Sequence, residues 1–175
     1  MQEQHRDQVL SWLEEPHVRE FWDNSPEHLL DIDLFLKGRK LPSPYFDGLM
    51  SYWIGQVGRE GFAFILTSPI KIEQGLPDLW RHHLSPSGHT YSLDFCIGNR
   101  KYLGKGFAAP TLQAFMSYFK QHVDTQADKF FIDPDADNSR ACHVYAKAGF
   151  ESVGFYELPH GFFAGQESEL MVAGV

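Results

Sequence analysis

Residues 133–150 constrain the fold more than any other part of this 175-residue chain. They read DPDADNSRACHVYAKAGF and follow an apolar run over residues 129–132, which predicts a short strand. Asn138 is suited to cap the start of a helix. Gly149 stands where a left-handed residue would end that helix. We therefore expect a strand, a turn and a helix over residues 138–148, with Tyr145 two turns inside the helix.

Residues 101–108 form a second informative segment, with the sequence KYLGKGFA. Glycine at positions 104 and 106 permits positive φ angles and a close approach of the backbone to a ligand. A helix is expected over residues 106–121, because Leu112, Phe115, Met116 and Phe119 recur at helical spacing. Backbone N–H groups at such a helix start can bind phosphate, and Lys101 and Lys105 add positive charge. Taken alone, this segment fits an ordinary strand–helix connection equally well.

Hydrophobic periodicity and turn residues predict the other elements. Helices are expected over residues 5–22, divided at Pro16, and over 26–37, capped by Ser25, with Leu29, Leu30, Leu34 and Phe35 on the apolar side. Strands are expected over residues 52–56, 62–67, 90–97, 129–132, 151–156 and 168–172. Residues 69–90 contain several prolines and glycines and are expected to form a long loop. This order predicts an α/β chain with a mixed sheet.

Composition narrows the class of protein. The residues are 43% hydrophobic and 15% aromatic, which predicts a single domain over residues 1–175. A net charge of −8 disfavours nucleic acids and anionic membranes as partners. The polar N-terminus and the lack of a long apolar run predict a cytoplasmic protein without membrane contact. Two cysteines cannot form a disulfide framework, and the nine histidines lack metal-site spacing, so no metal is expected.

Residues 101–108 and 133–150 together resemble the two acyl-CoA-binding motifs of the GNAT N-acetyltransferase superfamily. The matching positions of the second motif are Asn138, Ala141, Tyr145, Lys147, Gly149 and Phe150. The resemblance extends over roughly residues 9–173 and is nearest to the aminoglycoside 6′-N-acetyltransferases and the related siderophore acyltransferases. The HVREFW segment at residues 17–22 also fits that branch. The resemblance implies the GNAT fold, with a mixed, mostly antiparallel central sheet flanked by helices.

Two positions depart from the superfamily pattern. Lys101 stands where an arginine or glutamine is usual. The usual first strand has no sequence here, because helix signals begin by about residue 5. We therefore expect that edge strand to be absent or replaced, which leaves the CoA-binding motifs intact.

The resemblance also implies a co-substrate and the residues that bind it. Acetyl-CoA is expected as the acyl donor. The residues expected to contact it are Cys96, Ile97, Lys101, Leu103, Gly104, Lys105, Gly106, Phe107, Ala108, Asn138, Arg140, Ala141 and Tyr145.

Asp94 is the candidate general base. It lies inside the predicted strand 90–97, where aspartate is disfavoured and needs a reason. An alkyl ammonium with a pKa of about 10.4 is deprotonated to about one part in a thousand at pH 7, so a nearby carboxylate would help to remove its proton. In the resembling enzymes the matching aspartate contacts the substrate amine, and Tyr145 is expected to protonate the departing thiolate. The alternatives are a structural aspartate and a core tyrosine.

Aromatic and acidic residues are candidates for an amine-binding pocket, since aromatic faces and carboxylates both attract cations. The candidates are Trp22, Asp78, Trp80, Asp94 and Asp133. Each has a structural alternative: the tryptophans can belong to the core, and Asp133 can cap the turn before Asn138.

These features predict an acetyl-CoA-dependent N-acetyltransferase acting on the primary amine of a small cationic molecule, such as an aminoglycoside or a polyamine. Direct attack of the amine is expected, without an acyl-enzyme on Cys96. A siderophore-type acyltransferase acting on a hydroxylamine or diamine is one alternative. A catalytically silent acyl-CoA-binding module is another. The chain is expected to be a monomer or a homodimer, and an exposed sheet edge would favour the dimer.

Overall fold

A computed structural model describes all residues from 1 to 175, and its internal contacts divide the chain into two compact units. The first unit comprises Met1–Ser68 and Asp94–Lys105, and the second comprises Pro69–Leu93 and Gly106–Val175. Two of the boundaries fall inside strands, at residues 68/69 and 93/94, and each unit is built from two separate segments of sequence. The expectation of a single domain over residues 1–175 stays a prediction.

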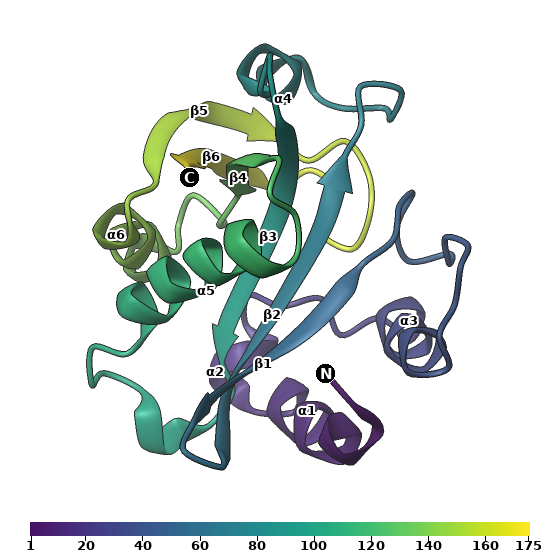
Figure 1. Ribbon diagram of the computed structural model, residues 1–175, viewed down its shortest axis with the longest axis vertical. Helices are drawn as coiled ribbons and strands as arrows, with labels where there is room; N and C mark the ends of the chain where they lie inside the picture. Colours follow the sequence, from purple (N-terminus) through teal and green to yellow (C-terminus); the bar gives the residue numbers. More distant parts are fainter. The chain divides into compact units, whose positions relative to one another are not determined.

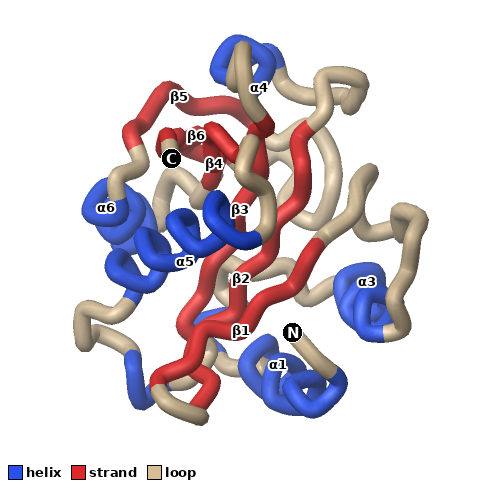
Figure 2. The backbone as a smooth tube through the Cα atoms, viewed as in Figure 1, coloured by secondary structure: helices blue, strands red, loops and turns tan.

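Six strands form the sheet, coloured red in Figure 2. They are β1 (Ser51–Val57), β2 (Glu60–Ile70), β3 (His89–Ile97), β4 (Ala127–Ile132), β5 (Glu151–Glu157) and β6 (Glu167–Gly174), in the spatial order β1-β2-β3-β4-β6-β5. β3 and β4 run parallel, whereas β1–β2, β4–β6 and β5–β6 are antiparallel pairs. The sheet is therefore mixed and mostly antiparallel, which confirms the predicted fold class.

The first unit begins with helices and has no strand before them. A short 3-10 turn, η1 (Glu3–His5), leads into α1 (Arg6–Leu13), α2 (Pro16–Arg19) and α3 (Pro26–Leu36). The usual edge strand was expected to be absent or replaced, and η1 is the first element described. The Met1 ammonium instead donates a hydrogen bond of 2.8 Å to the carbonyl oxygen of Tyr52 on β1. Val9, Trp12 and Trp22 join Tyr52 and Phe64 in the core of this unit.

The inward face of α3 differs from the prediction. Leu29 and Leu30 are 37% and 46% exposed, whereas His28, Asp31 and Ile32 are buried. Asp31 accepts hydrogen bonds from the hydroxyls of Tyr52 and Ser43 and forms an ion pair of 2.9 Å with Arg39. These partners satisfy the buried carboxylate, so a polar network replaces the leucines that periodicity placed inside.

The second unit contains α5 (Ala108–His122) and α6 (Ser139–Ala148), which lie side by side (Figure 1) and contact each other. The ring of Phe119 on α5 meets that of Phe130 on β4 edge-on, with centroids 5.4 Å apart. The predicted apolar face of α5 is confirmed, because Leu112, Phe115, Met116 and Phe119 are all buried. α5 therefore covers one face of β4.

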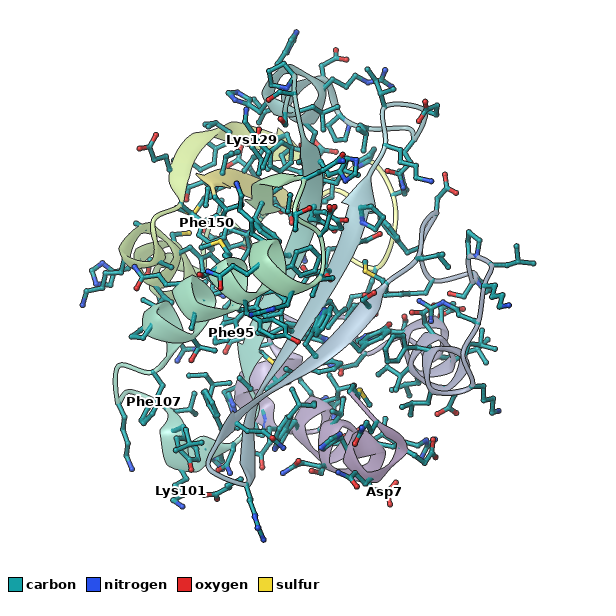
Figure 3. The ribbon with its side chains drawn as sticks, viewed as in Figure 1. Asp7, Phe95, Lys101, Phe107, Lys129 and Phe150 are labelled. Atoms are coloured by element: carbon teal, nitrogen blue, oxygen red, sulfur yellow. The ribbon has the colours of Figure 1, made fainter.

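A short helix, α4 (Asp78–His83), contacts the β4 residues whose side chains point away from α5. Phe131 meets Trp80 of α4 edge-on at 5.5 Å, and Lys129, labelled in Figure 3, donates a hydrogen bond of 2.8 Å to the carbonyl oxygen of His83. The prediction of an unbroken loop over residues 69–90 was therefore wrong. β2 extends to Ile70 and β3 begins at His89, and α4 lies between them, held by tertiary contacts rather than by local periodicity.

Candidate active site

Asp94, the predicted general base, lies half-buried on β3 in the first unit. Its neighbours Leu93 and Phe95 are buried, and strand alternation turns Asp94 to the other face. Burial raises the pKa of Tyr45 well above its usual value, and the negative charge of Asp94 raises the pKa of that phenol further. The structure thus places Tyr45 in the electrostatic neighbourhood of Asp94. Sequence reasoning did not single out this tyrosine.

Cys96 and Ile97 form the end of the same strand. Burial raises the pKa of the Cys96 thiol to about 12, so almost no thiolate exists at neutral pH. Nε2 of His17 lies 2.9 Å from the carbonyl oxygen of Ile97 and, because its partner is a carbonyl, is the donor. His17 therefore fixes the strand end, and the state of Cys96 opposes a covalent acyl-enzyme.

The glycine turn has the backbone form that its sequence predicts. A 3-10 turn, η2 (Arg100–Tyr102), precedes it, and Gly104 and Gly106 have φ angles of 68° and 77°. A Cβ atom added at either glycine would meet nothing within 4 Å, so both positions face open space. α5 then begins at Ala108, where the first N–H groups of a helix lack acceptors inside the helix. Helix starts of this kind commonly bind phosphate groups, so contact of the turn with acetyl-CoA stays a prediction.

The two lysines of the turn differ in their surroundings. The Lys101 ammonium lies 2.7 Å from Oε2 of Glu60, and the Tyr102 hydroxyl donates to the same carboxylate oxygen at 2.6 Å. The charge of Lys101 is therefore balanced within the first unit. Lys105 is exposed. Figure 3 labels Lys101 and also Phe107, the residue before α5. Contact of either lysine with acetyl-CoA stays a prediction.

α6 has the cap and the end that its sequence predicts. The side chain of Asn138 accepts a hydrogen bond of 3.1 Å from the N–H of Ala141, and Gly149 adopts a left-handed φ of 102°. Tyr145 is 7% exposed, and its ring centroid lies 6.2 Å from that of Phe150. Arg140 is exposed on the first turn of the helix. The helix therefore holds Tyr145 in a defined position within the second unit.

A carboxylate and two aromatic rings meet where β4 ends in the second unit. The Tyr156 hydroxyl, from β5, donates a hydrogen bond of 2.6 Å to Oδ2 of Asp133. Trp80 of α4 meets the rings of Phe131 and Tyr156 edge-on, at 5.5 and 6.1 Å between centroids. The structure thus brings together two predicted site residues, Asp133 and Trp80, and adds Tyr156 to them.

Burial has the largest effect on the pKa of Asp133. It raises the pKa of this half-buried carboxyl group to about 6, although the hydrogen bond from Tyr156 lowers that pKa. In the turn before Asn138, the N–H of Asp137 donates its hydrogen bond to Asp135. With a pKa of about 6, Asp133 is mostly ionised at neutral pH. Its assignment to substrate binding stays a prediction.

Of the remaining predicted pocket residues, Trp22 lies in the first unit and Asp78 lies on the same helix as Trp80 in the second. Trp22 is 8% exposed and packs against Phe64 and His28 in the core of the first unit. Asp78 is exposed at the first position of α4, two residues before Trp80. An acidic residue at a helix start is also favoured by the helix dipole. Both assignments to substrate binding stay predictions. No group of three or more His, Cys, Asp or Glu side chains is placed to hold a metal ion.

Comparison with known proteins identifies the family. The profile of a family described as "Acetyltransferase (GNAT) domain" matches residues 77–158, a range that includes Asp94, Asp133 and Tyr145. A "Kanamycin resistance protein" from Rhizobium radiobacter is 30% identical over 82 residues, which are 47% of this chain and 72% of that protein. The chain belongs to the GNAT acetyltransferase family.

Other relatives of this GNAT chain extend the likeness over most of its length. An "Aminoglycoside N(6')-acetyltransferase type 1" from Klebsiella pneumoniae is 25% identical over 153 residues, covering 87% of this chain and 72% of that protein. A solved aminoglycoside N(6')acetyltransferase from Legionella pneumophila is 25% identical, with a TM-score of 0.75 over 99% of this chain and 88% of the other. Like other GNAT enzymes, this protein is an N-acetyltransferase that uses acetyl-CoA.

Sequence reasoning assigned no functional role to two tyrosines that contact or surround predicted site residues, one in each unit. Tyr156 was assigned to a strand, but its partner Asp133 became visible only with the strand order, in which β6 separates β4 from β5. Tyr45 lies in a segment without regular structure, between α3 and β1. The one local signal for Tyr156 was a tyrosine in a strand position, which more often indicates packing than function.

Proposed function

We propose that this GNAT enzyme acetylates a primary amine of a small polycationic molecule, such as an aminoglycoside or a polyamine, within a ternary complex with acetyl-CoA. The observation that carries the proposal is the Asp133 carboxylate, ionised at neutral pH and bordered by the rings of Trp80 and Tyr156. Carboxylates and aromatic faces both attract ammonium groups. Relatives named as an aminoglycoside acetyltransferase and a kanamycin resistance protein support the same class of acceptor, as does the net charge of −8.

Two side chains would carry the proton transfers. Asp94 would take the proton from the bound ammonium, directly or through water, because an alkyl amine is almost wholly protonated at neutral pH. The neutral amine would then attack the thioester carbonyl carbon. The oxyanion so formed would accept a hydrogen bond from a backbone N–H near Cys96 or Ile97. The tetrahedral adduct would then collapse with cleavage of the carbon–sulfur bond, and Tyr145 would donate its hydroxyl proton to the departing CoA thiolate. The nitrogen would lose its remaining extra proton, which would return to Tyr145 directly or through water.

The acyl donor would be held by the glycine turn and the start of α6. The open space at Gly104 and Gly106 and the first N–H groups of α5 suit the pyrophosphate of CoA. Direct attack is favoured over an acyl-enzyme, because burial keeps the Cys96 thiol protonated.

The test is acetyl-CoA turnover with a panel of acceptors, followed as CoA thiol release. The panel contains aminoglycosides, polyamines, N-hydroxylysine and short peptides. We expect turnover with aminoglycosides or polyamines. Asp94→Asn should lower kcat/KM by about 100-fold or more, as expected for loss of a general base. Tyr145→Phe should lower kcat by a smaller factor.

Matched variants distinguish loss of these catalytic roles from a general loss of folded protein. Asp47→Asn and Tyr118→Phe make the same chemical changes at exposed positions and should leave turnover unchanged. Turnover of N-hydroxylysine alone would replace the proposal with the siderophore-type alternative. Saturable acetyl-CoA binding without turnover of any acceptor would replace it with the silent binding module.

A further inference from the structure

The hydrogen bond between Tyr156 and Asp133 spans an intervening strand. Tyr156 pairs with Ser168 on β6, and β6 pairs on its other side with β4, which ends just before Asp133. Neighbouring strands lie about 4.8 Å apart, so β5 and β4 are separated by roughly 10 Å of sheet. The tyrosine side chain, the hydrogen bond and the aspartate side chain together span that distance.

Packing alone does not require the hydroxyl of Tyr156. The ring meets Trp80 edge-on, and a phenylalanine would make the same contact. The hydroxyl instead occupies one oxygen of Asp133, and an ionised carboxylate can accept several further hydrogen bonds. Trp80 and the pairing of β5 with β6 fix the tyrosine itself, so the tyrosine can in turn fix the carboxylate.

We propose that Tyr156 is a positioning residue that holds the Asp133 carboxylate in the orientation and charge state that bind the substrate ammonium. This inference rests on the proposed function, since it needs an amine that binds at Asp133. Tyr156 acts through Asp133 and touches no reacting atom. It therefore governs affinity for the amine rather than the chemical step.

The charge state of Asp133 gives the proposal a second readout. The hydrogen bond from Tyr156 lowers the pKa of Asp133, so its loss raises that pKa above about 6. A larger fraction of the carboxyl group is then protonated near pH 6 and binds an ammonium poorly. The titratable and charged groups on the elements around Asp133 are Asp78, Arg81, His82 and His83 of α4, Asp128 and Lys129 of β4, Glu151 and Glu157 of β5, Glu167 and Glu169 of β6, and Asp135 and Asp137 of the following turn.

The test compares Tyr156→Phe with wild type in the turnover assay, using the best amine of the panel from pH 5.5 to 8.5. KM for the amine should rise about tenfold, the effect of losing one hydrogen bond to a charged group, while kcat changes less than about twofold. The acidic limb of kcat/KM should move to higher pH. The matched control is Tyr91→Phe, which removes a 2.7 Å bond from a tyrosine to Asp124 in the same unit and should change neither quantity.

A double-mutant cycle shows whether Tyr156 acts through Asp133. Tyr156→Phe in an Asp133→Asn background should raise KM less than about twofold further, because the carboxylate that it positions is already gone. Fully additive effects would overturn the inference, as would a wild-type KM and pH profile in Tyr156→Phe. Absence of turnover with every amine in the wild type would instead refute the proposed function. Thermal unfolding of each variant confirms that it is folded.

Discussion

The charge of Asp133 has a cost to the fold. Burial opposes ionisation of this carboxyl group, and the hydrogen bond from Tyr156 offsets only part of that opposition, since the pKa remains at about 6. In the unfolded chain an aspartate has a pKa of about 3.9. At neutral pH the Asp133 carboxylate is therefore less stable in the folded protein than in the unfolded chain, where water surrounds it. Residues kept under such conditions often serve binding or catalysis.

Asp133→Asn should stabilise the protein in a pH-dependent manner. Below about pH 4 the carboxyl group is protonated in both folded and unfolded states, so the substitution should change the free energy of unfolding little. Between about pH 4 and pH 6 the unfolded state ionises first, and the gain should grow to about 3 kcal/mol and then stay constant. Urea titrations at pH 4 and pH 8 measure this. Equal effects at both pH values would contradict the raised pKa of Asp133.

Among the elements, α6 was predictable and α4 was not. The limits of α6 depend on local signals: Asn138 caps its own helix, and Gly149 ends it with a left-handed φ. α4 has six residues and depends on distant partners, namely the ring of Phe131 and the ammonium of Lys129. Short helices gain most of their stability from tertiary packing, so the sequence around Trp80 carried no helix signal. Tyr156 was missed for the related reason that strand order is non-local.

Gly154 allows α4 to rest on β5, and its substitution should disturb that contact. Its φ is 145°, and an added Cβ would lie 3.3 Å from Leu79 of α4. Gly154→Ala should lower the free energy of unfolding by about 1–3 kcal/mol through backbone strain and overpacking. Gly161→Ala serves as control, since its φ is also positive, at 91°, but nothing lies within 4 Å. A greater loss of Tm at Gly161 than at Gly154 would refute the contact.

α3 carries two aspartates whose substitution should have unequal effects. Asp31 is 1% exposed in its ion pair with Arg39, so Asp31→Ala should leave a buried, unpaired guanidinium and cost about 3–5 kcal/mol. Asp33 pairs with Arg6, and their side chains are 32% and 35% exposed, so Asp33→Ala should cost far less. Urea denaturation of the two variants compares these effects at positions two residues apart. Similar losses would show that burial does not decide the strength of these pairs.

At the scale of the whole molecule, the family and the sheet were predictable from two short motifs. One motif specifies the glycine turn between β3 and α5, and the other specifies the capped helix α6 that follows β4. The two strands are parallel neighbours, and few folds combine these features. The sequence could not decide whether Trp22 lies in the core or in a pocket, because burial of an aromatic ring depends on the whole chain. The structure places it in the core. None of the helices is both long and apolar enough to cross a membrane.

The interleaved segments of the two units have a consequence for biosynthesis. The first unit draws on residues 94–105, so a nascent chain on the ribosome cannot complete it until the glycine turn has been translated. The second unit waits longer, since β6 must insert between β4 and β5. Until then, each of those strands presents unpaired backbone groups along one edge to the solvent. Chaperone capture during translation should therefore be strongest in the interval between synthesis of β5 and synthesis of β6.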